Sequence, residues 1–243
     1  MLQRPVLIIL LFALVPLFSQ CNLAGTQVIR GDGHVITSTH EVEFFNAIEL
    51  QGAFSNVRLV PGTELTVTME TDENLMELFR VEIADETLVI ASDRDIILQP
   101  TKMYMTIVYP ELNRLNIQGA CKISSFEQVV SDVLSLEISG AADLDLDVAV
   151  QSLRTQVSGA GNISLEGTAG KHEIRLSGAS NLEASRLITS STSINLSGAG
   201  SATVNATDKL DASLSGIGKI VYHGDPTEKT IDKSGLGSIA SAR

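Results

Sequence analysis

The sequence has 243 residues, of which 44% are hydrophobic and only 4% aromatic, with no tryptophan. This length allows a sizeable core, and the shortage of large rings predicts a thin core of small and branched aliphatic side chains. Seventeen basic and 29 acidic residues give a net charge of −12, which argues against a nucleic-acid partner and against electrostatic attraction to anionic lipid.

Residues 1–20 are typical of an export signal. Arg4 precedes an almost entirely apolar run from Pro5 to Phe18, which is shorter than the roughly 20 residues that span a membrane. Cys21 follows, so the segment resembles a bacterial lipoprotein signal, in which the cysteine thiol is acylated. We therefore expect a lipid anchor on Cys21 and a tether over 21–33, with a plain secretory signal as the alternative.

Residues 34–114 are expected to form the N-terminal β part of a β-solenoid. Apolar alternation between turn signals predicts strands at 34–37, 41–50, 55–60, 64–70, 80–84, 87–92 and 103–109. One segment, 72–79, favours a short helix, because acidic residues open it and its apolar residues share one face. Thr71 or Asp72 can cap this helix, which at two turns must pack against the strands.

A tripeptide of Ser or Gln, then Gly, then a small or aliphatic residue recurs through residues 115–243. Its corner glycines are Gly119, Gly140, Gly159, Gly178, Gly198, Gly216 and Gly235. They are spaced 18 to 21 residues apart, with a typical interval of 19. Apolar residues alternate with polar ones on both sides of each glycine, which predicts a strand before it and a strand after it.

Such a unit cannot bury its own apolar row, but stacked copies can. The repeat therefore predicts an all-β, single-stranded parallel β-helix, a solenoid with turns of about 19 residues and one short helix near 72–79. Each corner glycine either adopts a backbone angle that other residues avoid or lies where successive turns crowd. The preceding serines are expected to stack as a hydroxyl ladder that satisfies corner backbone groups, rather than to form a ligand site.

Three acids, Asp143, Asp145 and Asp147, alternate with apolar residues and so share one outward strand face. They are a weak candidate for a calcium site of the kind that β-helix polysaccharide lyases use. The preferred interpretation is a solvated face that blocks aggregation. No lysine or arginine is expected at this face on neighbouring turns, with Lys171 and Arg175 the nearest basic residues.

No other motif indicates chemistry. With Cys21 lipidated, Cys121 lacks a partner and is expected to be a small buried residue. The four histidines have no metal-binding spacing, and His172 and His223 are expected to lie in solvated loops or turn edges. We therefore expect no catalytic residue, no metal and no cofactor.

Several short motifs in a fixed order resemble the bacterial head GIN domain family, also called "putative auto-transporter adhesin". They are Gly31-Asp32-Gly33, Phe45-Asn46-Ala47-Ile48, Gln51-Gly52-Ala53-Phe54, Pro61-Gly62, Asp72-Glu73-Asn74-Leu75, Tyr109-Pro110-Glu111-Leu112 and the Ser-Gly-Ala repeats. The resemblance covers about residues 30–240. It implies a parallel β-helix, usually right-handed, in envelope proteins that often carry a lipoprotein signal, and it implies no established activity.

We expect a non-catalytic, envelope-anchored protein that presents an elongated surface to a protein or glycan ligand. It would be an outer-membrane lipoprotein facing the periplasm or the cell surface, and a monomer whose residues 225–243 form a polar cap on the last turn. The alternatives are a polysaccharide-acting β-helix enzyme and a purely structural or regulatory component of the envelope.

Overall fold

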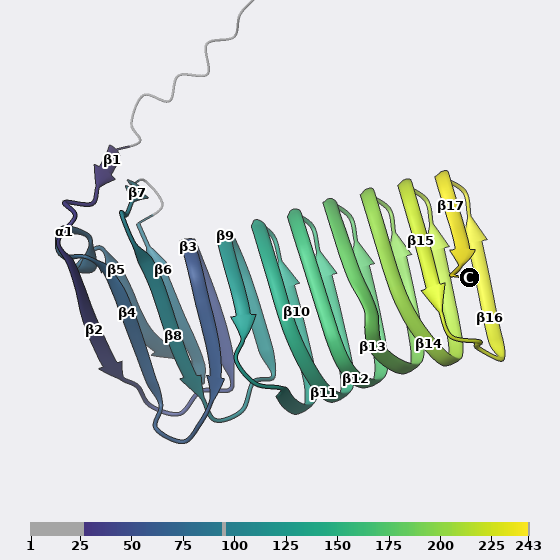
Figure 1. The fold of residues 1–243 in the computed structure, drawn as a ribbon, viewed down its shortest axis with the longest axis horizontal. Coiled ribbons are helices and arrows are strands. Elements are labelled where there is room, and N and C mark those ends of the chain that lie inside the picture. The colour runs from purple at the N-terminus through teal and green to yellow at the C-terminus, as the bar shows by residue number, and fades with distance from the viewer. Residues whose placement is uncertain (1–26, 94–95, 243) are drawn as a thin grey trace, which may run out of the picture.

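The computed structural model describes residues 27–93 and 96–242, which are almost entirely strand (Figure 1). The N-terminal elements are β1 (Gln27–Arg30), β2 (Val35–Glu41), β3 (Ala47–Pro61), β4 (Thr66–Asp72), α1 (Glu73–Met76), β5 (Phe79–Ala84), β6 (Thr87–Ser92), β7 (Ile96–Gln99) and β8 (Met103–Tyr109). The later elements are β9 (Arg114–Ser125), β10 (Val129–Ile138), β11 (Ala141–Val157), β12 (Ala160–Leu176), β13 (Ala179–Leu196), β14 (Ala199–Leu214), β15 (Ile217–His223), β16 (Glu228–Lys233) and β17 (Leu236–Ser241).

From β9 onward the chain winds as a parallel solenoid. Each strand pairs in parallel with the equivalent strand of the next turn, through to β16 on β14 and β17 on β15. Figure 1 shows these turns stacked side by side from teal to yellow along the long axis of the molecule. The predicted parallel β-solenoid with turns of about 19 residues is confirmed, and it has about seven turns.

The N-terminal part combines parallel and antiparallel pairs. β3 pairs in parallel with β9, β6 and β8, and so joins this part to the solenoid. β4 pairs antiparallel with both β2 and β8, and β5 pairs antiparallel with β6. Within the segment expected as a tether, β1 forms a small parallel pair with β7, and neither strand was predicted.

The predicted helix is shorter than expected. α1 has four residues, and Phe79 already belongs to β5, where it pairs with Ser92. Asp72 is the residue before the helix, but its side chain makes no cap hydrogen bond. Its buried carboxylate instead accepts hydrogen bonds from the backbone N–H of Gly33 (2.8 Å) and from the N–H (2.7 Å) and hydroxyl (2.6 Å) of Thr101. The hydroxyl of Thr101 is the main reason that the pKa of Asp72 is lowered.

The corner glycines form one column along the solenoid. A Cβ on Gly178 would overlap the carbonyl oxygen of Gly159, and a Cβ on Gly159 would overlap that of Gly140, with the same relation at the other corners. None of the seven glycines has a positive φ. Crowding between turns therefore explains the glycines, and the special backbone angle does not.

The corner serines bond to the backbone instead of to one another. The hydroxyls of Ser139, Ser158 and Ser177 each donate to a carbonyl of the preceding turn, at 3.3, 3.4 and 3.3 Å. The backbone N–H groups of these serines donate to the same carbonyls. These bonds satisfy corner backbone groups, which is the structural role expected for the serines.

The core consists of columns of buried side chains in register from turn to turn. One column contains Leu134, Leu153, His172, Thr192 and Leu210, all of them buried. The expectation of a solvated His172 is therefore wrong. This residue has the same strand parity as the buried Ile174, so the alternation itself directs the imidazole inward.

The last turn places lysines where earlier turns have core leucines. Lys229 is in register with Leu210, and Lys233 is in register with Leu214. The Lys229 ammonium lies 5.3 Å from the centre of the Tyr222 ring, across the open end of the core. Since long basic side chains can cover apolar surface while their charge stays in water, this arrangement fits the expected polar cap.

Candidate functional site

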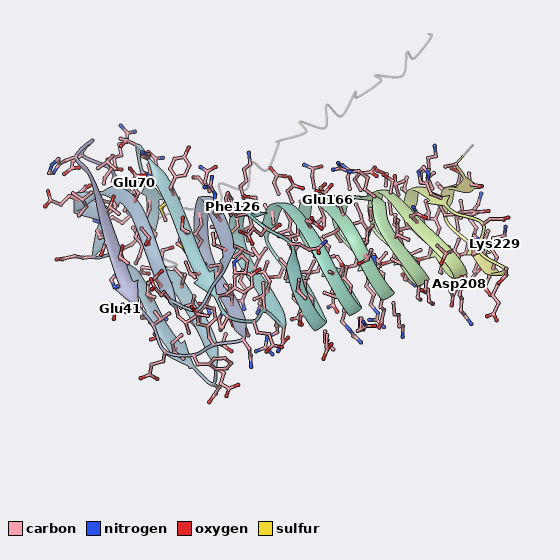
Figure 2. All side chains as sticks on the ribbon, turned by 60° about the horizontal axis from the view of Figure 1, so that its bottom comes forward. Glu41, Glu70, Phe126, Glu166, Asp208 and Lys229 are labelled. Carbon is pink, nitrogen blue, oxygen red and sulfur yellow. The ribbon has the colours of Figure 1, made fainter. Side chains whose placement is uncertain are left out.

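A groove lies on the outward face of β9, β11, β12 and β13, and we call it the outer groove. Its volume is about 460 Å³. Its polar lining consists of Lys122, Ser124, Asp143, Asp145, Asn162, Ser164, Asn181, Glu183 and Arg186. Figure 2 shows side chains projecting outward along the whole solenoid and labels Glu166, which forms an ion pair with Arg186 of this groove.

Strand alternation places these side chains on the outside. Asp143 and Asp145 are exposed on β11, whereas Leu144 and Leu146, their neighbours in sequence, are buried in the core. Because β11 and β12 run in register, Asn162 lies directly beside Asp143 on the next turn. The solenoid therefore converts residues about 19 positions apart in sequence into neighbours on one surface.

Four of the outward side chains form a hydrogen-bonded ladder across four turns. Asn162 Nδ2 donates to Asp143 Oδ1 at 2.9 Å, and Asn181 Nδ2 donates to Asn162 Oδ1 at 3.2 Å. The hydroxyl of Ser201 donates to Asn181 Oδ1 at 2.9 Å. Each bond joins one turn to the next, so the ladder holds these side chains in fixed orientations. We call these four residues the amide ladder.

Basic residues share this face, contrary to expectation. Lys122 is in register with Asp143 one turn earlier. Arg186 reaches the groove because the pairing of β12 with β13 shifts register before Glu166, which then binds the Arg186 guanidinium at 2.9 Å. The expected absence of lysine and arginine on neighbouring turns is therefore wrong.

Glu183 is held in its charged form at the edge of the groove. Partial burial opposes ionisation of this carboxylate, but hydrogen bonds from Ser185 and Thr203 outweigh that effect. The backbone N–H of Ser185 donates to Glu183 Oε1 at 3.0 Å. The pKa of Glu183 is consequently lower than that of an ordinary glutamate, and the groove contains a permanent negative charge at neutral pH.

Two of the three acids of the calcium candidate have separate hydrogen-bond partners. Asp143 accepts from Asn162, whereas Asp147 accepts from Gln128 at 2.8 Å. Over residues 27–93 and 96–242 no group of three or more His, Cys, Asp or Glu side chains is arranged to hold a metal ion. The carboxylates of Asp143 and Asp147 therefore act as hydrogen-bond acceptors.

The remaining candidate residues lie away from the outer groove or outside the described residues. Cys121 is buried, as expected, and burial raises the pKa of its thiol to about 12, so the thiol is protonated and unreactive. Cys21 lies outside the described residues. His223 lies at the end of β15, and burial lowers the pKa of His172 to about 3.

A second hollow, of about 450 Å³, lies between the corner edge and β7. Gln51 and Gln118 line it, in place of the serines found at later corners, and both donate to Glu49 Oε1, at 2.6 and 2.8 Å. Sequence reasoning missed this hollow because β7 was not predicted. The replacement of Ser by Gln at two successive corners is the signal that marks it.

A family comparison matches residues 44–226 to "Putative auto-transporter adhesin, head GIN domain". The chain belongs to this family. A search among curated proteins gives no match. Within the described head GIN domain no helix has the length and hydropathy to cross a membrane.

Solved structures share the head GIN fold. A "putative adhesin" from Bacteroides fragilis is 29% identical, covers 88% of this chain and 100% of its own, and superposes with a TM-score of 0.85. A "putative lipid binding protein" from Parabacteroides distasonis is 20% identical, covers 89% of this chain and all of its own, and has a TM-score of 0.72. A "putative adhesin" from Parabacteroides merdae is also 20% identical over 89% of this chain and 100% of its own, with a TM-score of 0.64.

Proposed function

We propose that this protein is a non-catalytic, adhesin-like binding protein of the cell envelope. The observation that carries the proposal is the outer groove: polar side chains from four turns are exposed, ordered by hydrogen bonds and aligned along a long rigid body. A surface of this kind can contact an extended ligand, either a protein or a glycan. Membership of the "Putative auto-transporter adhesin, head GIN domain" family and the resemblance to the "putative adhesin" from B. fragilis support it.

Attachment to the membrane would come from the N-terminus. The apolar run that ends before Cys21 supports export and acylation of that cysteine. The net charge of −12 gives no electrostatic attraction to anionic lipid, so the lipid would hold the protein at the outer membrane. The solenoid would then face the periplasm or the cell surface as a monomer.

A polysaccharide-acting enzyme is the second candidate, and one observation favours it. Lys122 beside Asp143 brings a possible proton acceptor to an acidic strand face, as a polysaccharide lyase requires. Incubation with acidic polysaccharides tests this reading, because a lyase would create unsaturated chain ends that absorb ultraviolet light. Formation of such ends by the wild type, and their loss in Lys122→Ala, would replace the binding proposal.

Capture from the native envelope tests the proposed function directly. The full-length protein, purified in detergent, is immobilised and exposed to an envelope extract of its own cells, with a glycan array probed in parallel. We expect specific retention of a protein or binding to a subset of glycans. If both experiments are blank, the adhesin-like proposal fails and a purely structural or regulatory role is favoured.

A further inference from the structure

We propose that the outer groove binds a neutral carbohydrate chain that lies along the solenoid axis. This inference rests on the proposed adhesin-like function and adds to it a site and a ligand class. Three properties of the groove carry it: the hydrogen-bonding capacity left over by the amide ladder, the fixed orientation of its side chains, and its mixture of charges.

The amide ladder leaves hydrogen-bonding groups free at regular intervals. Asn162 uses one N–H toward Asp143 and one carbonyl lone pair toward Asn181, and Asn181 uses the same two groups toward Asn162 and Ser201. A side-chain amide has two N–H groups and two lone pairs, so each asparagine retains one donor and one acceptor for a ligand. Successive turns are about 4.8 Å apart, so donors and acceptors repeat along the axis. Sugar hydroxyls both donate and accept, and they match such a row.

The side chains around the ladder are already ordered before a ligand arrives. The ion pair with Glu166 holds Arg186, and the backbone N–H of Ser185 holds Glu183. Ordering flexible polar side chains is one of the main free-energy costs of binding, and here the fold has already met that cost. Prior ordering of the side chains matters most for the affinity of a polyhydroxylated chain, because each of its hydrogen bonds contributes little net free energy.

Charge and apolar content narrow the ligand class. The groove combines the acids Asp143, Asp145 and Glu183 with the bases Lys122 and Arg186, and the whole protein is strongly acidic. An acidic polysaccharide would meet net repulsion, whereas a neutral chain would not. The apolar residues that line the groove, Ile123, Leu144 and Ile163, are buried, so the groove lacks the exposed hydrophobic anchors that usually hold a peptide.

Affinity electrophoresis of the full-length chain in detergent tests the inference. Native gels contain dextran, a mixed-linkage β-glucan or a galactomannan as neutral probes, and alginate as an anionic one. We expect at least one neutral polysaccharide to slow the wild type. Asn181→Leu and Arg186→Ala should weaken that binding by about tenfold, because each removes hydrogen-bonding groups that line the groove.

Two control variants match these residue by residue at positions that do not line the groove. Asn195→Leu changes an exposed asparagine of the same strand, β13. Arg175→Ala removes an exposed arginine that, like Arg186, forms an ion pair with a glutamate, here Glu173. Both controls should bind like the wild type, and circular dichroism with thermal melting checks that all four variants fold. If Asn181→Leu has a lower melting temperature than the wild type, the test relies on the binding of Arg186→Ala alone.

Each contrary result has a defined meaning. The proposed site is wrong if all four variants bind the polysaccharide as the wild type does. It is also wrong if the Asn195 and Arg175 controls lose as much binding as the Asn181 and Arg186 variants. Retardation by alginate alone would overturn the neutral ligand class. If no polysaccharide slows the wild type but an envelope protein is captured, this inference is wrong and the adhesin-like function stands. If nothing binds in either experiment, both are wrong.

Discussion

Thr155 Oγ1 lies 3.0 Å from Nε2 of His172, and both side chains are buried inside the solenoid core. The imidazole occupies a position that Leu153 and Leu210 fill in other turns of the same column. Burial lowers the pKa of His172 from 6.5 to about 3, so between these two pH values the ring is neutral in the folded state and protonated in the unfolded state.

This pair predicts an acid sensitivity that a double variant removes. Below pH 6.5 His172 is protonated in the unfolded state, whereas in the folded state it stays neutral down to about pH 3. The free energy of unfolding therefore falls as the pH decreases through this window. His172 alone contributes a slope of up to about 1.4 kcal/mol per pH unit. The variant His172→Leu with Thr155→Val should lose this slope while keeping the column packed.

Urea unfolding at several pH values between 6.5 and 4.5 measures this effect, and the range stays above the titration of Asp72. His40→Gln, a change to an exposed histidine of β2, serves as the control and should keep the wild-type slope. An unchanged slope in the double variant would show that His172 is protonated in the folded state.

The corner crowding predicts that Gly178→Ala destabilises the solenoid. The added methyl group would overlap the carbonyl oxygen of Gly159, so the two turns must move apart and strain their strand pairing. We expect a loss of about 1–3 kcal/mol in the free energy of unfolding. Ala179→Ile is the matched control, because Ala179 is exposed and its column contains Ile217 two turns later. A melting temperature equal to that of the wild type would refute the crowding argument.

We expect the lysines of the last turn to prevent end-to-end assembly of solenoids. Replacing Lys229 and Lys233 by leucine continues two core columns to the open edge, so the last turn should recruit another chain. We expect elongated oligomers in size-exclusion chromatography with light scattering. Lys219→Leu, which alters the outer face, should remain monomeric. A monomeric double variant would mean that the lysines do not protect the edge.

Removal of residues 225–243 tests the whole cap. The truncation uncovers Leu210, Leu214 and Ile220, which the last turn now contacts in register. The shortened chain should therefore aggregate or elongate in scattering experiments. A stable monomer with unchanged unfolding free energy would contradict the cap.

The export signal predicts lipidation of Cys21. Cys21→Ser should release the protein from the membrane fraction into the soluble fraction of its host cell, because a single serine cannot carry the acyl chains. Metabolic labelling with a fatty acid should mark the wild type and not the variant, and Cys121→Ser should still be labelled. Wild-type protein found free of the membrane fraction would refute the anchor.

The sequence by itself determined the solenoid. The glycine interval of about 19 residues defines the turn, and two-residue alternation decides which side chains enter the core, as Leu144 and Leu146 illustrate. The amide ladder was also within reach, since its members Asp143, Asn162, Asn181 and Ser201 each stand three positions after a corner glycine. These features depend only on the spacing of residues along the sequence. That spacing is visible without knowledge of which segments pair in the folded protein.

Only the tertiary structure reveals the features that depart from the regular repeat. Arg186 enters the outer groove through a register shift against β12, and β7 forms a hollow beside Gln51 and Gln118 by pairing with β1. The carboxylate of Asp72 binds Gly33 and Thr101 instead of capping a helix. In each case the partner of a side chain or strand is distant in sequence. The packing of the whole chain determines that partner, because local periodicity carries no information about distant residues.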